Sequence, residues 1–189
     1  GTRTSQGTYV GKNTTLRADA THSGDGGKVI VWSDKTTRSY GAISARGGVL
    51  SGNGGFVETS GLETLDVTNS PLVHARSGNA DDRGGEWLLD PFNIDIVSSC
   101  TGADCLDDAL EEAGSYDPDL FFSGTVMSDN DETVSQVGVD LIKQVLLTGS
   151  NVTITTEGAG SEEGDDLGNI NFLADADLLF GDIDGALPS

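Results

Sequence analysis

The sequence predicts an all-β fold, a parallel β-helix or solenoid, and three observations support this prediction. Gly-Gly pairs recur at positions 26–27, 54–55 and 84–85, at nearly even spacing. Each pair precedes a short run of β-forming residues, namely KVIVWSD, FVETSG and EWLLDP. A repeat of this length is too small to bury a core of its own. Successive repeats must therefore stack, with each strand paired to its equivalent in the next repeat.

Side chains alternate along these runs, as expected for strands. Val29 and Val31 share one face of the first run, with Ile30 opposite, and Val57 and Thr59 share one face of the second. Glycines at the corners are expected to turn the chain through positive φ. A β-sandwich is the alternative fold. However, the sequence lacks an Asn-Gly or Asp-Gly hairpin between two alternating runs.

Three segments are expected along the chain: stacked repeats over 1–99, an acidic insertion over 100–148 on the same solenoid, and further repeats over 149–189. The insertion contains two predicted short helices, over 104–114 and 133–148. The second helix is predicted from the helical spacing of Val137, Leu141, Val145 and Thr148. Gly149 is the predicted stop, and strands are expected again at Asn151–Thr156 and Asn169–Leu173.

The net charge of −21 is concentrated in the second half of the chain. Positions 1–90 carry 10 acidic and 9 basic side chains, whereas positions 91–189 carry 21 acidic side chains and one basic side chain, Lys143. Such a charge repels nucleic acid and anionic membranes, so neither is an expected partner. No apolar run approaches the roughly 18 residues of a membrane span, so no membrane insertion is expected.

Two cysteines, Cys100 and Cys105, are expected to form a local disulfide, and free thiols are the alternative. Oxygen ligands at alternate positions make weak Ca²⁺ candidates of Asp129, Asp131, Asp182 and Asp184. These stretches do not complete a known Ca²⁺ loop, so solvated acidic loops are the favoured interpretation. No other cofactor is expected.

The remaining polar and aromatic candidates favour structure over chemistry. Catalysis by two carboxylates needs a converging pair, and the spacing of the acidic residues singles out none. Those considered are Asp34, Glu58, Asp66, Glu86 and Asp90. His22 and His74 are isolated and are expected in turns or at the surface. An aromatic sugar-binding platform is the alternative to ladder packing for Trp32, Trp87, Tyr40 and Phe92.

An ordered set of motifs resembles the large exoproteins of two-partner secretion, the filamentous-haemagglutinin-like adhesins of bacteria. The set runs GGKVIVWSDKTTRSYGAISARGG, GNGGFVETSG, GGEWLLDPFNIDI, and then LLTGSNVTITTEG with GNINF. The resemblance covers most of 8–99 and 141–173. It implies a right-handed parallel β-helix, export through an outer-membrane partner transporter and a place at the bacterial cell surface.

The resulting expectation is a shaft segment of a secreted adhesin, without catalysis, that contributes to adhesion or aggregation through its length. The receptor would be a host-cell or bacterial surface molecule or glycan. Two alternatives remain open: a β-helical enzyme acting on polysaccharides, and the stick of a contact-dependent toxin.

Overall fold

The computed structural model describes residues 5–67, 69–74, 76, 79–98, 135–156, 168–173 and 176. Within these ranges the chain forms twelve strands and one helix. The strands are β1 (Gly7–Val10), β2 (Thr15–Arg17), β3 (Lys28–Ser33), β4 (Thr36–Ser39), β5 (Ala42–Ser44), β6 (Phe56–Gly61), β7 (Thr64–Val67), β8 (Glu86–Leu89), β9 (Ile94–Val97), β10 (Ser135–Gly138), β11 (Asn151–Ile154) and β12 (Ile170–Phe172). The helix is α3 (Val139–Leu147).

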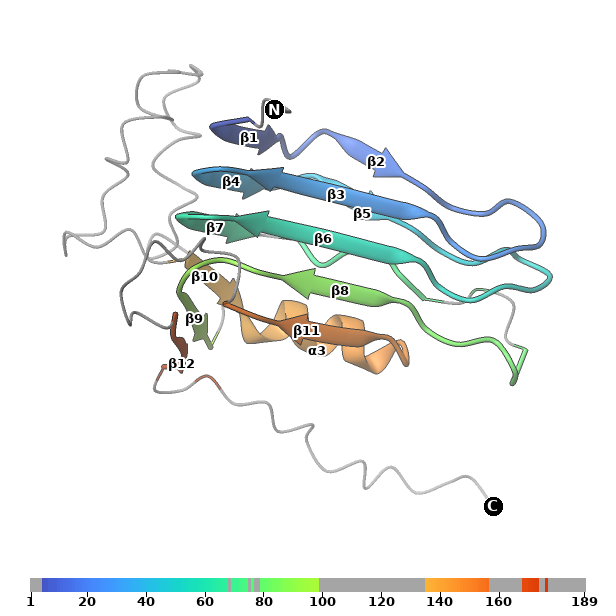
Figure 1. Ribbon diagram of the computed structural model, residues 1–189. Helices are drawn as coiled ribbons and strands as arrows, with labels where there is room; N and C mark the ends of the chain where they lie inside the picture. The colour runs from blue at the N-terminus through green and yellow to red at the C-terminus, as the bar shows by residue number, and fades with distance from the viewer. Residues whose placement is uncertain are drawn as a thin grey trace.

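In the described ranges the named strands pair in parallel and build three sheets, here called walls (Figure 1). The first wall has the order β1-β4-β7-β10-β9-β12. The second has the order β11-β8-β6-β3, and the third consists of β2 and β5. The predicted all-β, parallel class is therefore confirmed.

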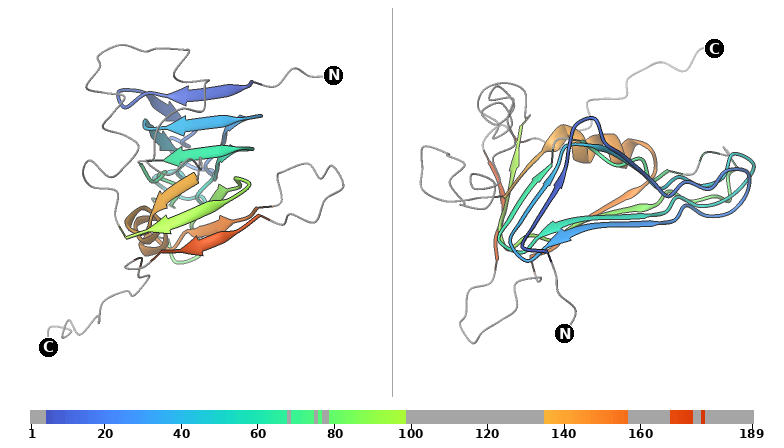
Figure 2. Two further views of the ribbon diagram at one scale, coloured as in Figure 1. Left: turned by 90° about the vertical axis from the view of Figure 1, so that its left-hand side faces the viewer. Right: turned by 90° about the horizontal axis from the view of Figure 1, so that it is seen from above.

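Strand register repeats the spacing seen in the sequence. Lys28 aligns with Phe56, and Phe56 aligns with Glu86, so the second wall keeps the spacing of the Gly-Gly pairs. In the first wall Thr36 aligns with Thr64, which is the same spacing as from Lys28 to Phe56. The chain therefore passes each wall about once per repeat, and we call one such passage a circuit. Seen from above, the first circuits superimpose as a triangle with one drawn-out corner (Figure 2).

Aliphatic and aromatic side chains fill the space between the walls. Val31, Val57 and Trp87 are buried and belong to one core cluster, whereas Ile30 is 53% exposed. The indole Nε1 of Trp87 donates a hydrogen bond of 2.9 Å to Thr59 Oγ1 in the preceding circuit. The predicted alternation is confirmed for Val31 opposite Ile30 on β3, and for Val57 and Thr59 on one face of β6. Full burial of one such apolar side chain contributes about 1.5–3 kcal/mol to stability.

The Gly-Gly pairs have a role that the sequence did not indicate. In the drawn-out corner the second and third walls approach so closely that Gly55 N donates to Ala45 O of the same circuit at 2.7 Å. A Cβ on Gly54 would lie 1.7 Å from Val73 O. Positive φ occurs instead near the tip of this corner, at Gly24 (113°) and Gly52 (134°). The pairs are glycine because a side chain would force the walls apart.

The helix predicted over 133–148 is wrong at its N-terminal end. Residues 135–138 form β10, which lies between β7 and β9 in the first wall. Ser135 and Val137 alternate inward there, because pairing with two neighbouring strands outweighs local helical spacing. The helix α3 follows at 139–147, and Gly149 (φ 75°) comes just after its end, as predicted.

Helix α3 lies on the side of the triangle that β2 and β5 occupy in the earlier circuits (Figure 2). It buries Val139, Ile142 and Val145. Of the residues predicted at helical spacing, Val145 is buried, Leu141 packs partly buried against the core, Thr148 is exposed just after the helix, and Val137 belongs to β10. The chain then returns to the second wall as β11, which pairs with β8. The predicted strands at 151–156 and 169–173 correspond to β11 and β12. The helix predicted over 104–114 falls outside the described residues.

Candidate functional site

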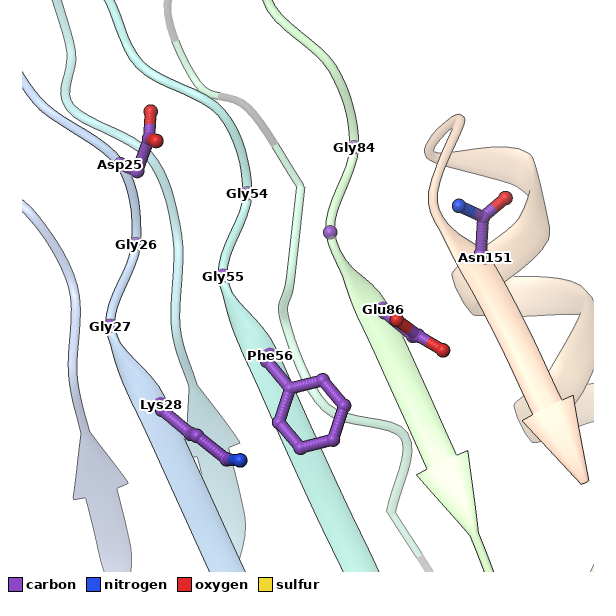
Figure 3. A pocket seen from close by; sticks show the side chains of 11 residues that line it. Asp25, Gly26, Gly27, Lys28, Gly54, Gly55, Phe56, Gly84, Glu86 and Asn151 are labelled. Atoms are coloured by element: carbon purple, nitrogen blue, oxygen red, sulfur yellow. The ribbon is translucent and has the colours of Figure 1, made fainter. Parts of the chain in front are cut away.

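A shallow groove of about 540 Å³ crosses the outside of the second wall. Four side chains at one register position, one from each strand, stand along it (Figure 3). They are Lys28, Phe56, Glu86 and Asn151. The three Gly-Gly pairs lie next to them at the starts of β3, β6 and β8, so one side of the groove is bare backbone.

The glycine backbone of the groove offers few free donors. Gly27 N, Gly55 N and Gly85 N each donate at 2.7 Å to carbonyls of the third-wall segment in the same circuit. Gly26 N and Gly54 N donate to Asn53 O and Arg83 O. Because these amides are already used inside the protein, a bound molecule would depend on the four side chains.

Those side chains also interact with the protein itself. Lys28 Nζ lies 4.5 Å from the centre of the Phe56 ring, within the range of a cation–π contact. The Thr153 hydroxyl donates to Glu86 Oε1 at 2.8 Å. The groove therefore presents a cation, an aromatic ring, a carboxylate and an amide in one row. Such a row can support surface contact. The lining includes a second carboxylate, Asp25, but it accepts hydrogen bonds from Asn53 N and Asn53 Nδ2 and lies apart from Glu86 in Figure 3, so the two do not converge as hydrolysis needs.

The other carboxylates considered from the sequence lie in separate places. Asp66 is buried and accepts a hydrogen bond of 2.6 Å from the Tyr40 hydroxyl. Asp90 accepts from Thr155 Oγ1, Asp34 lies in the corner between β3 and β4, and Glu58 lies half-buried on β6. Within the described ranges, no three His, Cys, Asp or Glu side chains gather as a metal site would require.

A charged ladder that the sequence did not single out lies along the third-wall side. Arg17 aligns with Ser44, and Ser44 bridges to Leu72, so two residues further on Asp19, Arg46 and His74 share one register position. Arg46 Nη2 lies 2.9 Å from Asp19 Oδ2, and the Arg46 backbone N–H donates to Asp19 Oδ1 at 2.8 Å. In the sequence, Ala18-Asp19 and Ala45-Arg46 take the same place in two successive repeats, but no such dipeptide marks His74.

Electrostatics in this ladder favour a neutral histidine beside an ionised aspartate. Burial raises the pKa of Asp19, but hydrogen bonds from Arg46 and Ser44 outweigh burial and lower this pKa to about 2. Burial lowers the pKa of His74, and the Arg46 and Arg76 guanidinium groups lower it further against the opposing effect of Asp19. In the described part, the buried Nδ1 of His74 has no hydrogen-bond partner. The ladder is a structural ion pair with a histidine held neutral.

The four aromatic residues considered as a sugar platform do not form one. Trp87 and Tyr40 are buried, at 0% and 2% exposure, whereas Trp32 and Phe92 are half-buried on different segments. Ladder packing, the other interpretation, holds for Trp87, and Tyr40 packs edge-on against Tyr9 with ring centres 5.7 Å apart.

Several predicted sites fall outside the described residues. These are the disulfide pair Cys100 and Cys105 and the Ca²⁺ candidates Asp129, Asp131, Asp182 and Asp184. His22 is described, and it is exposed in the drawn-out corner, where a turn or surface position was expected. His74, by contrast, is half-buried.

No family model matches the chain, and a search of curated proteins gives no match either. Among the described residues, the one helix is too short to cross a membrane.

Proposed function

We propose that this chain is a segment of a right-handed parallel β-helix that serves as the shaft of a secreted bacterial adhesin. The observation that carries the proposal is the constant register of the walls. In the circuits that run from β1 to β8, a nearly constant spacing in the sequence, close to that of the Gly-Gly pairs, relates the paired strands in all three walls, around one aliphatic core. A protein built this way gains length by adding circuits, each about 4.8 Å high.

The chemistry of the outer surface supports a structural role over catalysis. The lining of the groove on the second wall contains two carboxylates, Glu86 and Asp25, and each accepts a hydrogen bond from the protein itself, from Thr153 and from Asn53 respectively. The carboxylates considered from the sequence are spread over corners, the core and outward faces. A polysaccharide lyase or hydrolase needs two or three groups acting on one bond, so the enzyme hypothesis has less support.

The resemblance to filamentous-haemagglutinin-like exoproteins supports the rest of the proposal. In this proposal the protein crosses the outer membrane through a partner transporter and stays at the cell surface or in the medium. Its receptor is a host-cell or bacterial surface molecule or glycan. The chain contributes reach, and contact with the receptor is made elsewhere in the exoprotein.

A matched pair of substitutions in the surface exoprotein tests this role. Val57→Asp places a carboxylate in the core, where Val57 is 0% exposed, and should abolish folding, surface display and adhesion together. Ile30→Asp changes an outward residue of the adjacent strand that is 53% exposed. It should leave both display and adhesion unchanged. Display is measured by antibody binding to intact cells, and adhesion by counting attached bacteria.

Two results would contradict the shaft proposal. In the first, an outward substitution, Ile30→Asp or Phe56→Ala, removes adhesion while surface display persists, which would place the receptor contact in this chain. In the second, the purified chain cleaves an acidic polysaccharide and loses the activity in Glu86→Gln.

A further inference from the structure

The first wall contains a break in the order of circuits. We call the position of a strand in the stacking order of its wall a level. β8 pairs with β6, so it occupies the next level of the second wall. β9 follows β8 in the chain, but it does not pair with β7 in the first wall. Instead β10, which comes after β9 in the chain and begins only at Ser135, lies between β7 and β9. A later strand thus occupies the level that the repeat assigns to β9.

The spacing of β9 fits the level that β10 occupies. Leu65 of β7 and Ile94 of β9 are both buried inward residues. Their spacing in the sequence equals that from Gly7 to Thr36, which align across β1 and β4 in the same wall. The corner 90–93 has four residues, where corners 34–35 and 62–63 have two. A four-residue corner is long enough to reach either level.

The inward side chains of β7 and β9 favour direct pairing of these two strands, whereas their outward side chains oppose it. In direct pairing Ile94 and Ile96 would meet Leu65 and Val67, whereas β10 offers Ser135 and Val137.

Outward, direct pairing would place Asp95 next to Asp66. In the observed order Gln136 stands between them, aligned with both carboxylates. Asp66 is buried on this face and aligns on its other side with Arg38, which offsets part of its charge. Adjacent like charges on a sheet are destabilising, so Gln136 separates two carboxylates whose remaining repulsion opposes direct pairing.

The junction of β7 and β10 is also the shorter one. β10 shares two registered positions with β7 but four with β9. The observed order is held in addition by α3, which buries Ile142 and Val145, and by the pairing of β11 with β8.

We propose that β9 and β10 compete for the edge of β7. The loop from β7 to β9 is shorter than the loop from β7 to β10, so β9 takes the edge first. β10 then displaces it when α3 and β11 pack, and Gln136 removes the contact between Asp66 and Asp95. The fourth level of the first wall thus forms by strand exchange.

Cysteine pairs in the full chain, with Cys100 and Cys105 replaced by Ser, report which strands are adjacent. Thr64→Cys with Asn93→Cys reports direct β7–β9 pairing and leaves the two aspartates and Gln136 intact. Thr36→Cys with Thr64→Cys reports the observed β4–β7 pairing and is the positive control. Thr36→Cys with Asn93→Cys is the negative control. Disulfides are trapped at intervals during refolding in a thiol–disulfide buffer and quantified by mass spectrometry.

We expect the 64–93 disulfide to form early and at least about tenfold faster than 36–93, because loop length alone accounts for only about a threefold difference. It should be scarce in the native chain, where β10 separates the two strands by more than the roughly 7 Å that a disulfide spans. Ile142→Ala weakens the packing of α3, and Asp95→Asn removes the repulsion. Each should raise the native yield of 64–93. The proposal is overturned if 64–93 forms no faster than 36–93 at any time, or if neither substitution raises its native yield.

Discussion

Replacement of Gly54 by alanine tests why the Gly-Gly pairs exist. The new Cβ would lie 1.7 Å from Val73 O, half the ordinary contact distance of about 3.4 Å, and 2.4 Å from Gly85 N. To remove this overlap, the second wall at Gly54 and the third-wall segment at Val73 must move apart by about half of the ordinary contact distance. The hydrogen bond from Gly85 N to Val73 O, now 2.7 Å, would then be broken.

We expect a loss of about 3–6 kcal/mol of unfolding free energy from Gly54→Ala. Overpacking accounts for about 1–3 kcal/mol, and the buried groups left without partners account for the remainder. Gly24→Ala is the matched control, because Gly24 has positive φ (113°) but no atom within 4 Å of the added Cβ. It should cost only about 1–2 kcal/mol. Urea unfolding followed by far-ultraviolet circular dichroism measures both.

A loss below about 1 kcal/mol in Gly54→Ala, or one no larger than in Gly24→Ala, would refute this reasoning. It would mean that the walls do not meet at the Gly-Gly pairs as described. The decisive result is which variant loses more unfolding free energy. Contact between the walls predicts a larger loss in Gly54→Ala, whereas a requirement for positive φ predicts a larger loss in Gly24→Ala.

Three further predictions concern single side chains. Asp19→Asn should lower the free energy of unfolding by about 1–2 kcal/mol through loss of the ion pair with Arg46. The ionised Asp19 stabilises the wild type above about pH 4, and this contribution is lost between about pH 4 and pH 2, so the variant should lack this part of the pH dependence. The folded-state pKa of His74 is lowered, so its contribution is complete above about pH 6.5 and is lost as pH falls below that value; His74→Gln should flatten this part of the stability profile, measured by urea midpoints at each pH. Trp87→Phe should lose about 1–2 kcal/mol because it leaves the Thr59 hydroxyl without its indole donor, and a Trp87→Phe, Thr59→Val double variant that regains nothing would contradict that explanation.

Local patterns predicted the second wall well. The strands β3, β6 and β8 follow the Gly-Gly pairs at the predicted spacing, and Val29, Val31 and Val57 face inward as their alternation indicated. These features depend on neighbouring residues and on a repeat, and both are visible in a single chain. The stop at Gly149 was predictable for the same reason.

Non-local features were not predictable from the sequence. The segment Ser135–Gly138 has only one β-branched residue, and its strand state depends on pairing with β7 and β9, which lie far away in the chain. Positive φ was expected of glycines at the corners, and Gly24 and Gly52 have it, but the sequence did not show why the Gly-Gly pairs are glycine. Their actual requirement, contact between two walls, needs the third dimension. The aligned Asp19, Arg46 and His74 likewise depend on stacking of three circuits.

The most direct test of the proposed solenoid is the duplication of one whole circuit. The segment 34–61 contains the corner 34–35 and the strands β4, β5 and β6, so a tandem copy of this segment adds one level to each of three walls. We expect this chain to fold, to unfold cooperatively and to be longer by about 4.8 Å along the stacking direction in small-angle scattering. Duplication of only 34–47 interrupts the register and should prevent folding. The account is contradicted if the whole-circuit duplication unfolds the protein as the half-circuit duplication does.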